Sequence, residues 1–393
     1  MFNCLLYVGF VATAFAWYGV QDVRETKMIA AILFALGLIM TELYLNGIKP
    51  NKNVWVLLLL LYIPIAQLLA PIIPTYLFGI ETQNFWFWKP FVKMLIFGLL
   101  FIVISSHEFS RSELINVLHI MVWCGFLTAV YHILQYVHLD QFFIVSDNRD
   151  LGRVAGFIGN PTLTAPFVAM LIPIAFYLRK YWMAGIMLIG AILPNSQMAW
   201  VALAGGIAVY FGLKNRRWME RVILVSIIAV LSFSALYFTN VKTRNLFSDH
   251  ERTMQWTQIF KDWSGPLDPA NGINTNNFLT GRGLGSFRYI YHQQHPDLVT
   301  PTGAVPRNSF AQAHNDYIEL GYGLGFVSLC LLFMGTLYTL LRNTTNSFYN
   351  RALISSFAII AISAIGSFVF QIGTVAYYSI IILGLIQNES RLA

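Results

Sequence analysis

The chain has 393 residues, of which 57% are hydrophobic and only 11% are charged. A soluble domain carries about 25% charged residues, so the composition excludes an ordinary soluble protein. It also excludes disorder, because 31 Phe, 19 Tyr and 10 Trp do not occur in a chain too polar to collapse. The net charge of +7 does not indicate a nucleic-acid partner, because in a membrane protein the positions of the positive charges matter more. We expect an all-α polytopic membrane protein in which residues 1–393 form a single membrane domain in contact with lipids.

Long apolar segments recur along the chain. A membrane-spanning helix needs roughly 20 apolar residues, and we identify about twelve candidates, of which the seventh is short. The first lacks a cationic leader and a small-residue cleavage site, and we interpret it as a retained helix and not as a signal peptide. The candidates cover approximately residues 4–20, 28–46, 54–78, 85–105, 114–136, 162–179, 182–194, 197–213, 219–239, 316–341, 352–370 and 372–388.

The distribution of Lys and Arg predicts the orientation. With a cytoplasmic N-terminus, the short inner loops carry more basic residues than the short outer loops, as inserted membrane proteins do. The inner set is Lys49, Lys52, Arg111, Arg179, Lys180, Lys214, Arg216, Arg217, Arg221, Arg342, Arg351 and Arg391. The outer set is Arg24, Lys27, Lys89, Lys93, Arg149 and Arg153. We therefore expect both termini in the cytoplasm.

One long outer loop is predicted over residues 240–315, between the ninth and tenth segments. A loop of this length is uncommon in a compact protein and is usually functional. Within it, Trp256, Phe260 and Trp263 recur at i, i+4 and i+7, which predicts a short helix with its aromatic side chains toward lipid or the bundle. A lid helix without chemistry is the alternative. A shorter outer segment, 137–161, is polar and glycine-rich, and we expect it to fold back on the bundle and open the sixth helix.

Familiar catalytic signatures are missing. The sequence contains no Asp-x-Asp pair, no P-loop, no G-x-S-x-G and no H-E-x-x-H motif. His292 and His295 have no evident third ligand, and the cysteines lie inside apolar runs without a Cys-x-x-Cys pair. We expect neither a metal site nor a cofactor.

The strongest candidate for chemistry is the segment 314–319, His-Asn-Asp-Tyr-Ile-Glu, where the long loop enters the tenth helix. Polar groups at membrane depth are costly and usually have a task. Histidine titrates near neutral pH, which suits a general base. The alternative is a capping role, in which His314 ends the loop while Asn315 and Asp316 bind free N–H groups of the helix.

Cationic side chains on the same predicted side favour a phosphate-bearing substrate, because guanidinium groups match phosphate oxygens bidentately. The alternative is that each of them is solvated or contacts lipid headgroups. The glycine-rich stretch 281–285 is expected to be a tight loop packed against the bundle and not a nucleotide site. The cations are Lys89, Lys93, Arg149, Arg153, Arg252, Arg282 and Arg288.

Four motifs carry a resemblance to a known family. They are Gly156-Phe-Ile-Gly-Asn-Pro-Thr-Leu-Thr-Ala165, Arg252-x-x-x-Trp256, Gly281-Arg-Gly-Leu-Gly-Ser-Phe287, and His314-Asn315 followed after nine residues by Gly325. In this order they resemble the O-antigen ligase and O-antigen polymerase superfamily of bacterial membrane glycosyltransferases. The resemblance covers roughly residues 115–388. It implies a GT-C-like fold with about 12 transmembrane helices and a large periplasmic loop between helices 9 and 10.

Two positions depart from the family pattern. The family's H-[NSQ]-x9-G-x-x-G motif ends here on Ser328, which we expect to affect helix packing more than chemistry. Many members also carry an arginine in a Ser-Arg pair at the outer hairpin between the seventh and eighth helices, where this chain has Gln197 after Ser196. If that arginine grips the donor, another cation substitutes for it here, for which we expect Arg153 and Lys93, or the donor differs.

The resemblance implies a metal-independent glycosyl transfer at the periplasmic face of the bacterial inner membrane. The donor would be a glycan on undecaprenyl pyrophosphate. The acceptor would be a hydroxyl of lipid A–core in a ligase, or a lipid-linked glycan in a polymerase. His314 would act as the base and Arg252 would stabilise the leaving group. The donor pyrophosphate would be held by Arg252, Arg288, Arg153 and Lys93, and the site or acceptor would be supported by Asn315, Asp316, Glu319, Asn160 and Gln197.

Alternatives remain within and outside the family. One dominant outer loop favours a ligase over a polymerase, which often has two. The chain ends just past the twelfth predicted helix, which argues against a protein O-oligosaccharyltransferase with its extra soluble region. A secondary transporter also suits twelve helices, but such proteins hold substrate groups near the midplane, whereas polar residues here gather at the outer face. The exceptions are His119 and His132, which we expect to satisfy neighbouring groups.

Overall fold

The computed structural model describes residues 1–15, 23–47, 54–69, 84–140, 153–214, 256, 259–260, 263, 278–284, 287, 313–342 and 347–389. Every regular element among these residues is helical, so the all-α prediction is confirmed for them. The chain divides into two compact units. Unit 1 comprises Met1–Lys52, Ile96–Met219 and Tyr338–Ala393, and unit 2 comprises Asn53–Leu95 and Glu220–Leu337.

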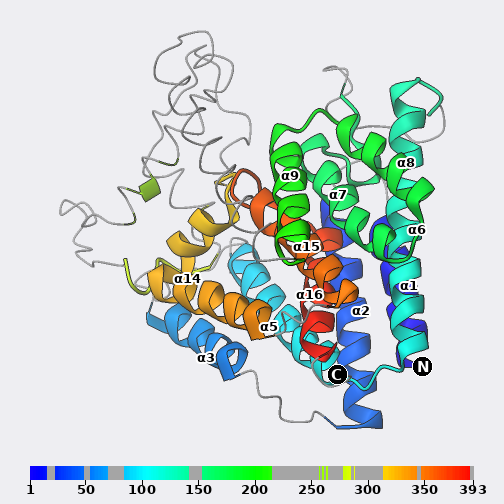
Figure 1. The fold of residues 1–393 in the computed structure, drawn as a ribbon. Coiled ribbons are helices and arrows are strands. Elements are labelled where there is room, and N and C mark those ends of the chain that lie inside the picture. Colours follow the sequence, from blue (N-terminus) through cyan, green and yellow to red (C-terminus); the bar gives the residue numbers. More distant parts are fainter. Residues whose placement is uncertain are drawn as a thin grey trace, which may run out of the picture. The chain divides into compact units, whose positions relative to one another are not determined.

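The helices follow the predicted apolar segments (Figure 1). Unit 1 contains α1 (Phe2–Phe15), α2 (Val23–Leu45), α6 (Arg111–Tyr136), α7 (Pro161–Tyr177), α8 (Tyr181–Ile192), α9 (Gln197–Gly212), α15 (Phe348–Ser363) and α16 (Gly373–Glu389). It also contains the short 3-10 turns η2 (Gly156–Ile158) and η5 (Val369–Gln371). Unit 2 contains α3 (Val54–Leu69), and both units share α5 (Asn84–Ser106) and α14 (Asp316–Arg342). The predicted segment 219–239 lies outside the described residues. One predicted boundary is wrong, since α15 ends at Ser363 and not near residue 370.

Within the described residues, three helical stretches are long and apolar enough to cross a membrane, namely Thr26–Leu45, Arg111–Tyr136 and Asp316–Leu340. Shorter apolar helical stretches there, such as Pro90–Ser106 of α5, have 10–17 residues. Helix α8 has 12 residues and is about 18 Å long, which is shorter than the hydrocarbon core of a bilayer, about 30 Å thick. These apolar helices are consistent with a membrane protein.

The helix ends of unit 1 gather into two separate sets. At one set, buried Lys27 at the start of α2 donates from Nζ to the carbonyl oxygens of Thr13 and Ala14 at the end of α1. Thr374 at the start of α16 donates to the same Thr13 oxygen over 2.6 Å. An ammonium group at a helix C-terminus satisfies carbonyls that lack partners in the helix and matches the helix dipole. The opposite ends of the same three helices meet in the other set.

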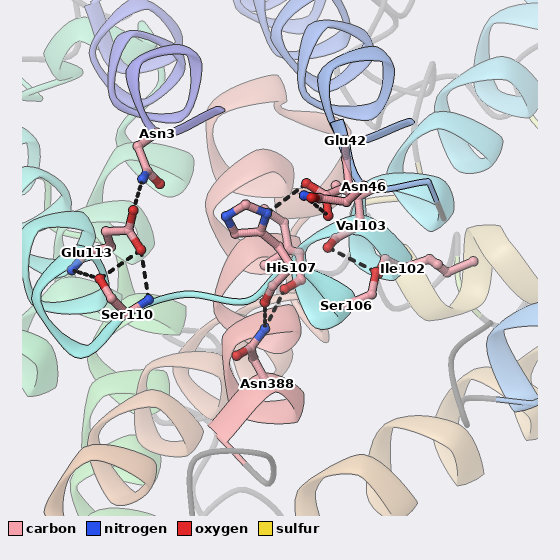
Figure 2. A network of polar contacts seen from close by, with 11 residues as sticks. Asn3, Glu42, Asn46, Ile102, Val103, Ser106, His107, Ser110, Glu113 and Asn388 are labelled. Carbon is pink, nitrogen blue, oxygen red and sulfur yellow. Dashed lines mark hydrogen bonds and ion pairs between the residues drawn. The ribbon is translucent and has the colours of Figure 1, made fainter. Parts of the chain in front are cut away.

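This second set is the polar network of Figure 2, centred on His107 at the end of α5. The Nδ1 atom of His107 lies 2.7 Å from Glu42 Oε2 of α2, and its ring stacks on Phe2 of α1. Asn388 of α16 donates from Nδ2 to the oxygens of Ile104, over 3.0 Å, and of His107. The first turn of α6 also belongs to this network. It begins with a capping box, in which Ser110 and Glu113 bind each other's backbone N–H groups. Asn3 of α1 donates a hydrogen bond to Glu113.

We expect Asn388→Leu to destabilise unit 1. The leucine keeps the branched shape of the side chain but leaves the carbonyl of Ile104, at the C-terminal end of α5, without its buried donor. An unsatisfied buried polar group costs about 1–3 kcal/mol, so the free energy of unfolding in detergent should fall by about that amount. Asn46→Leu is the matched control. Asn46 is exposed and its Nδ2 donates to Glu42, so this variant should lose less than about 1 kcal/mol of the free energy of unfolding. Equal losses in both variants would contradict the role assigned to Asn388.

Unit 2 is organised around a break in α14. Gly325 is non-helical there, with φ 78° and ψ 176°. The loop 278–284 docks on the break through backbone bonds that run in both directions. Arg282 N and Gly283 N donate to the oxygens of Tyr322 and Gly323 over 2.9 and 2.7 Å. In return, Phe326 N and Val327 N donate to the oxygens of Phe278 and Leu279 over 2.8 and 3.3 Å. The loop therefore satisfies backbone groups that a break in a helix would otherwise leave unpaired.

Side chains complete this junction. Buried Ser328 donates from Oγ to the oxygen of Gly325 over 2.7 Å, and Tyr62 of α3 donates to the oxygens of Leu279 and Leu324, each over 3.1 Å. The residue that departs from the family's final glycine thus bonds the carbonyl at the break. The prediction of a tight glycine-rich loop packed on a helix is confirmed for its described residues, 281–284.

Candidate functional site

The predicted base, His314, stands at the corner where the chain enters α14. Its φ is 51°, a left-handed conformation that costs a residue other than glycine about 1–2 kcal/mol. The residue after it, Asn315, is 6% exposed and caps the helix. Its Oδ1 accepts hydrogen bonds from the N–H groups of Tyr317 and Ile318, each over 3.0 Å. The capping role predicted as an alternative for this segment is therefore confirmed for Asn315.

The residue before His314 is anchored on both sides. The N–H of Ala313 donates to Glu319 Oε2 over 3.0 Å, and its carbonyl accepts from Trp256 Nε1 over 2.7 Å. Ala313 itself is fully buried. His314 is half-buried between these two buried neighbours, so its imidazole is the side chain of the corner that stays partly accessible. The backbone on both sides of His314 is therefore held by hydrogen bonds, and its titratable imidazole remains partly accessible.

A hydrophobic cluster supports the corner. Buried Ile259, Trp263, Phe287 and Tyr322 pack with Ala313, and Trp256 lies partly buried against them. The described positions 256, 259, 260 and 263 are helical, as predicted. Phe260 is 55% exposed, whereas Ile259 is fully buried.

The other predicted site residues fall into two groups. Lys93, half-buried on α5, belongs to unit 2 together with His314, Asn315, Asp316 and Glu319. Arg153, Asn160 and Gln197 belong to unit 1. Arg252 and Arg288 lie outside the described residues.

In unit 1, Arg153 lies on the hairpin between α8 and α9. Its Nε and Nη2 donate to the oxygen of Pro194 over 3.3 and 3.2 Å, and Nη2 also donates to the oxygen of Asn195 over 2.9 Å. Exposed Gln197 begins α9 two residues later. The guanidinium of Arg153 is therefore bound to the hairpin that precedes Gln197.

Asn160 acts as the N-cap of α7. Its Oδ1 accepts from the N–H and the hydroxyl of Thr162 over 2.9 and 2.7 Å, and Pro161 takes the first helical position, where no N–H is needed. The preceding Gly159 is left-handed with φ 78°. The expectation that segment 137–161 opens this helix is confirmed for its described residues.

The glycine that begins this motif packs against a buried histidine. His132 lies 2.7 Å from the oxygen of Gly190 through Nδ1 and 2.9 Å from Thr164 Oγ1 through Nε2. Gly156 has φ 60°, and a Cβ there would lie 2.2 Å from His132 Nε2. The prediction that His132 satisfies its neighbours is confirmed.

Two side chains matter more than the sequence indicated. Arg282, grouped above with the outward cations, is only 2% exposed. Its Nη1 donates to the hydroxyl of Tyr322 over 2.9 Å, and its guanidinium lies over the same ring. The sequence feature that indicates this burial is the position of Arg282 between two glycines of the loop that docks on α14. Trp256 is the second: the sequence patterns single it out, but none of them indicates its contact with Ala313.

Within the described ranges, no group of three His, Cys, Asp or Glu side chains is placed to hold a metal ion. The three cysteines are free thiols. A scan against protein-family models finds no match for the chain, and no curated protein sequence matches it.

Proposed function

We propose that the protein is an O-antigen ligase-like glycosyltransferase, which moves a glycan from undecaprenyl pyrophosphate to a hydroxyl of lipid A–core or a similar acceptor. The observation that carries the proposal is the corner at His314. A left-handed residue other than glycine persists where its surroundings over-determine it, and such strain gathers at functional sites. Here the hydrogen bonds of Ala313 and Asn315 fix the backbone on both sides of His314. The order of the four sequence motifs supports the same assignment.

The proposed reaction is a direct displacement at the anomeric carbon of the donor sugar. The acceptor oxygen forms a bond to this carbon, and the bond from the carbon to the pyrophosphate oxygen breaks. The pyrophosphate oxygen keeps the electron pair, and the His314 imidazole takes the hydroxyl proton. Cationic side chains offset the charge of the leaving group, which makes a divalent metal unnecessary. We assign this role to Arg252, with Arg288 and Lys93 holding the donor, and within unit 1 we assign donor binding to Arg153.

The position of Arg153 supports its share of that role. It reaches the α8–α9 hairpin from a different part of the chain and can supply there the positive charge that Gln197 lacks. Its Nε and Nη2 are engaged by the hairpin carbonyls, so the guanidinium is held in one orientation. A guanidinium held in this way contributes a fixed positive charge that attracts phosphate oxygens.

We further propose about twelve membrane spans with both termini in the cytoplasm and the active site in the periplasm. The two sets of helix ends in unit 1 support the alternation of these helices between two sides, and the distribution of Lys and Arg assigns the sides. Every segment in the network around His107, shown in Figure 2, belongs to the predicted inner side. The segments joined by Lys27 and Thr374 all belong to the predicted outer side.

A transfer assay in EDTA tests the proposal. Purified protein is mixed with an undecaprenyl-pyrophosphate glycan, with and without lipid A–core. Product on lipid A–core supports a ligase, whereas longer lipid-linked chains without that acceptor indicate a polymerase. Transfer to a protein acceptor would indicate a protein O-oligosaccharyltransferase. Solute flux in proteoliposomes without a new glycosidic bond would overturn the proposal in favour of a transporter.

We expect Arg252→Ala to lower donor use by about 100- to 1,000-fold, the usual effect of removing a group that stabilises developing charge. Arg252→Lys should restore little, because a lysine lacks the planar fork that binds two phosphate oxygens at once. Initial rates at varied donor concentration measure both variants. Lys214→Ala, at an exposed position after α9, is the control and should retain full activity. Full activity of Arg252→Ala would remove Arg252 from the mechanism.

A further inference from the structure

A hydrogen bond from Trp256 joins the helix around it to the corner at His314. The indole Nε1 of Trp256 donates to the carbonyl oxygen of Ala313 over 2.7 Å. Ala313 is fully buried, so water does not compete for this oxygen. Trp256 is itself partly buried against the cluster that contains Ala313 and Tyr322.

The geometry of the peptide bond makes this contact act on His314. The carbonyl of Ala313 and the N–H of His314 lie in one rigid plane. A donor that fixes the direction of the carbonyl therefore fixes the plane, and with it the rotation about the N–Cα bond of His314. That rotation is φ, which has the unfavourable value of 51°. Without the donor, the plane is free to turn toward the more favourable negative φ and carry the imidazole away from its position.

We infer that Trp256 is a positioning residue for His314, an inference that rests on the proposed function of His314 as the base. Trp256 acts through the backbone and does not touch the reacting atoms. Glu319 complements it from the other side, because it holds the N–H of Ala313. The two side chains come from different elements, so the imidazole is placed only when the helix around Trp256 is packed against α14.

The test compares two tryptophans of the same unit. Trp256→Phe keeps a buried aromatic ring but removes the N–H donor. Trp263→Phe is the matched control, because the Nε1 of Trp263 donates to the oxygen of Phe278 over 3.1 Å, away from the corner. A displacement of about 1 Å in a catalytic group costs on the order of 100-fold, so Trp256→Phe should lower kcat roughly 10- to 100-fold with KM nearly unchanged. Trp263→Phe should keep kcat within about threefold.

A double variant separates positioning from a general loss of structure. Once His314 is replaced by alanine, the additional Trp256→Phe change should leave the residual rate unchanged, because the group that Trp256 places is gone. A further loss in the double variant would overturn the inference. The inference would also be overturned if Trp256→Phe had the kcat of the unmodified protein while His314→Ala was inactive.

Hydrogen exchange gives a readout that does not depend on transfer. The amide protons of residues 313–318 should exchange faster in Trp256→Phe than in Trp263→Phe, because only the first change loosens the corner. Equal exchange in the two variants would overturn the inference whatever His314 does. Faster exchange together with an active His314→Ala variant would instead keep Trp256 as the residue that holds the corner and refute the proposed base.

Discussion

Replacing His314 by glycine is expected to abolish glycan transfer without destabilising the protein. The imidazole supplies the base in the proposed reaction, and loss of a general base typically costs 100- to 10,000-fold in rate. Glycine adopts a positive φ without a steric penalty, so the change relieves strain at the residue whose φ is 51°. Activity and stability should therefore move independently, which a merely structural histidine would not allow. The transfer assay and the midpoint of unfolding in detergent measure the two effects.

A second histidine provides the control for this experiment. His138 also has a left-handed conformation, with φ 59°, but it is exposed at the end of α6. His138→Gly makes the same chemical change at the same kind of backbone and should leave the transfer rate unaltered. Adding free imidazole should restore part of the activity of His314→Gly and none of any other inactive variant. Full activity of His314→Gly would exclude the base assigned here.

The positions of the helices could be predicted because apolar residues concentrate in segments of nearly the right length. Their ends were harder, since an apolar run does not show where pairing of the backbone stops. Ile365 to Phe370 continue the apolar run after α15, yet the helix has already ended at Ser363 and η5 follows. The break at Gly325 is a similar case, because the surrounding sequence reads as one uninterrupted helix. Only the docked loop, distant in the sequence, explains it.

At the candidate site, residue type and position identified His314 and Asn315, because a titratable ring and a capping amide at a loop–helix boundary have recognisable chemistry. The contact that holds them could not be predicted. An indole bonded to a backbone carbonyl, as in Trp256 and Ala313, leaves no pattern in the sequence of either segment. Arg282 was misplaced for a related reason. Its charge suggested a solvated or substrate-facing side chain, whereas Tyr322 offers it a buried partner.

Gly325→Ala is expected to be the most destabilising change in unit 2. With φ 78° and ψ 176°, Gly325 occupies a region of backbone conformation that is essentially restricted to glycine. A Cβ there would also lie 2.1 Å from the oxygen and 2.3 Å from the carbonyl carbon of Leu279. These are backbone atoms of the docked loop, so they cannot move aside as a flexible side chain would. Strain and lost loop contacts together should lower the free energy of unfolding by about 3 kcal/mol or more.

Gly185→Ala, in α8, is the matched control. A Cβ at Gly185 meets nothing within 4 Å, and the residue lies inside a regular helix. Alanine is favoured over glycine there by about 1 kcal/mol, so this variant should be as stable as the unmodified protein or slightly more stable. Denaturant titration in detergent measures both variants. Identical midpoints would contradict the docking of loop 278–284 on the break in α14.

The consequences of Gly325→Ala should extend to the site. The loop that it displaces holds Tyr322 through the backbone N–H and the guanidinium of Arg282, and Tyr322 packs in the cluster that contains Ala313. Loosening that cluster frees the peptide plane before His314, so transfer should fall together with stability. In His314→Gly, by contrast, transfer should fall alone. If Gly325→Ala lost stability and kept full activity, the docked loop would be a support for the membrane domain only, and the corner at His314 would hold its geometry without it.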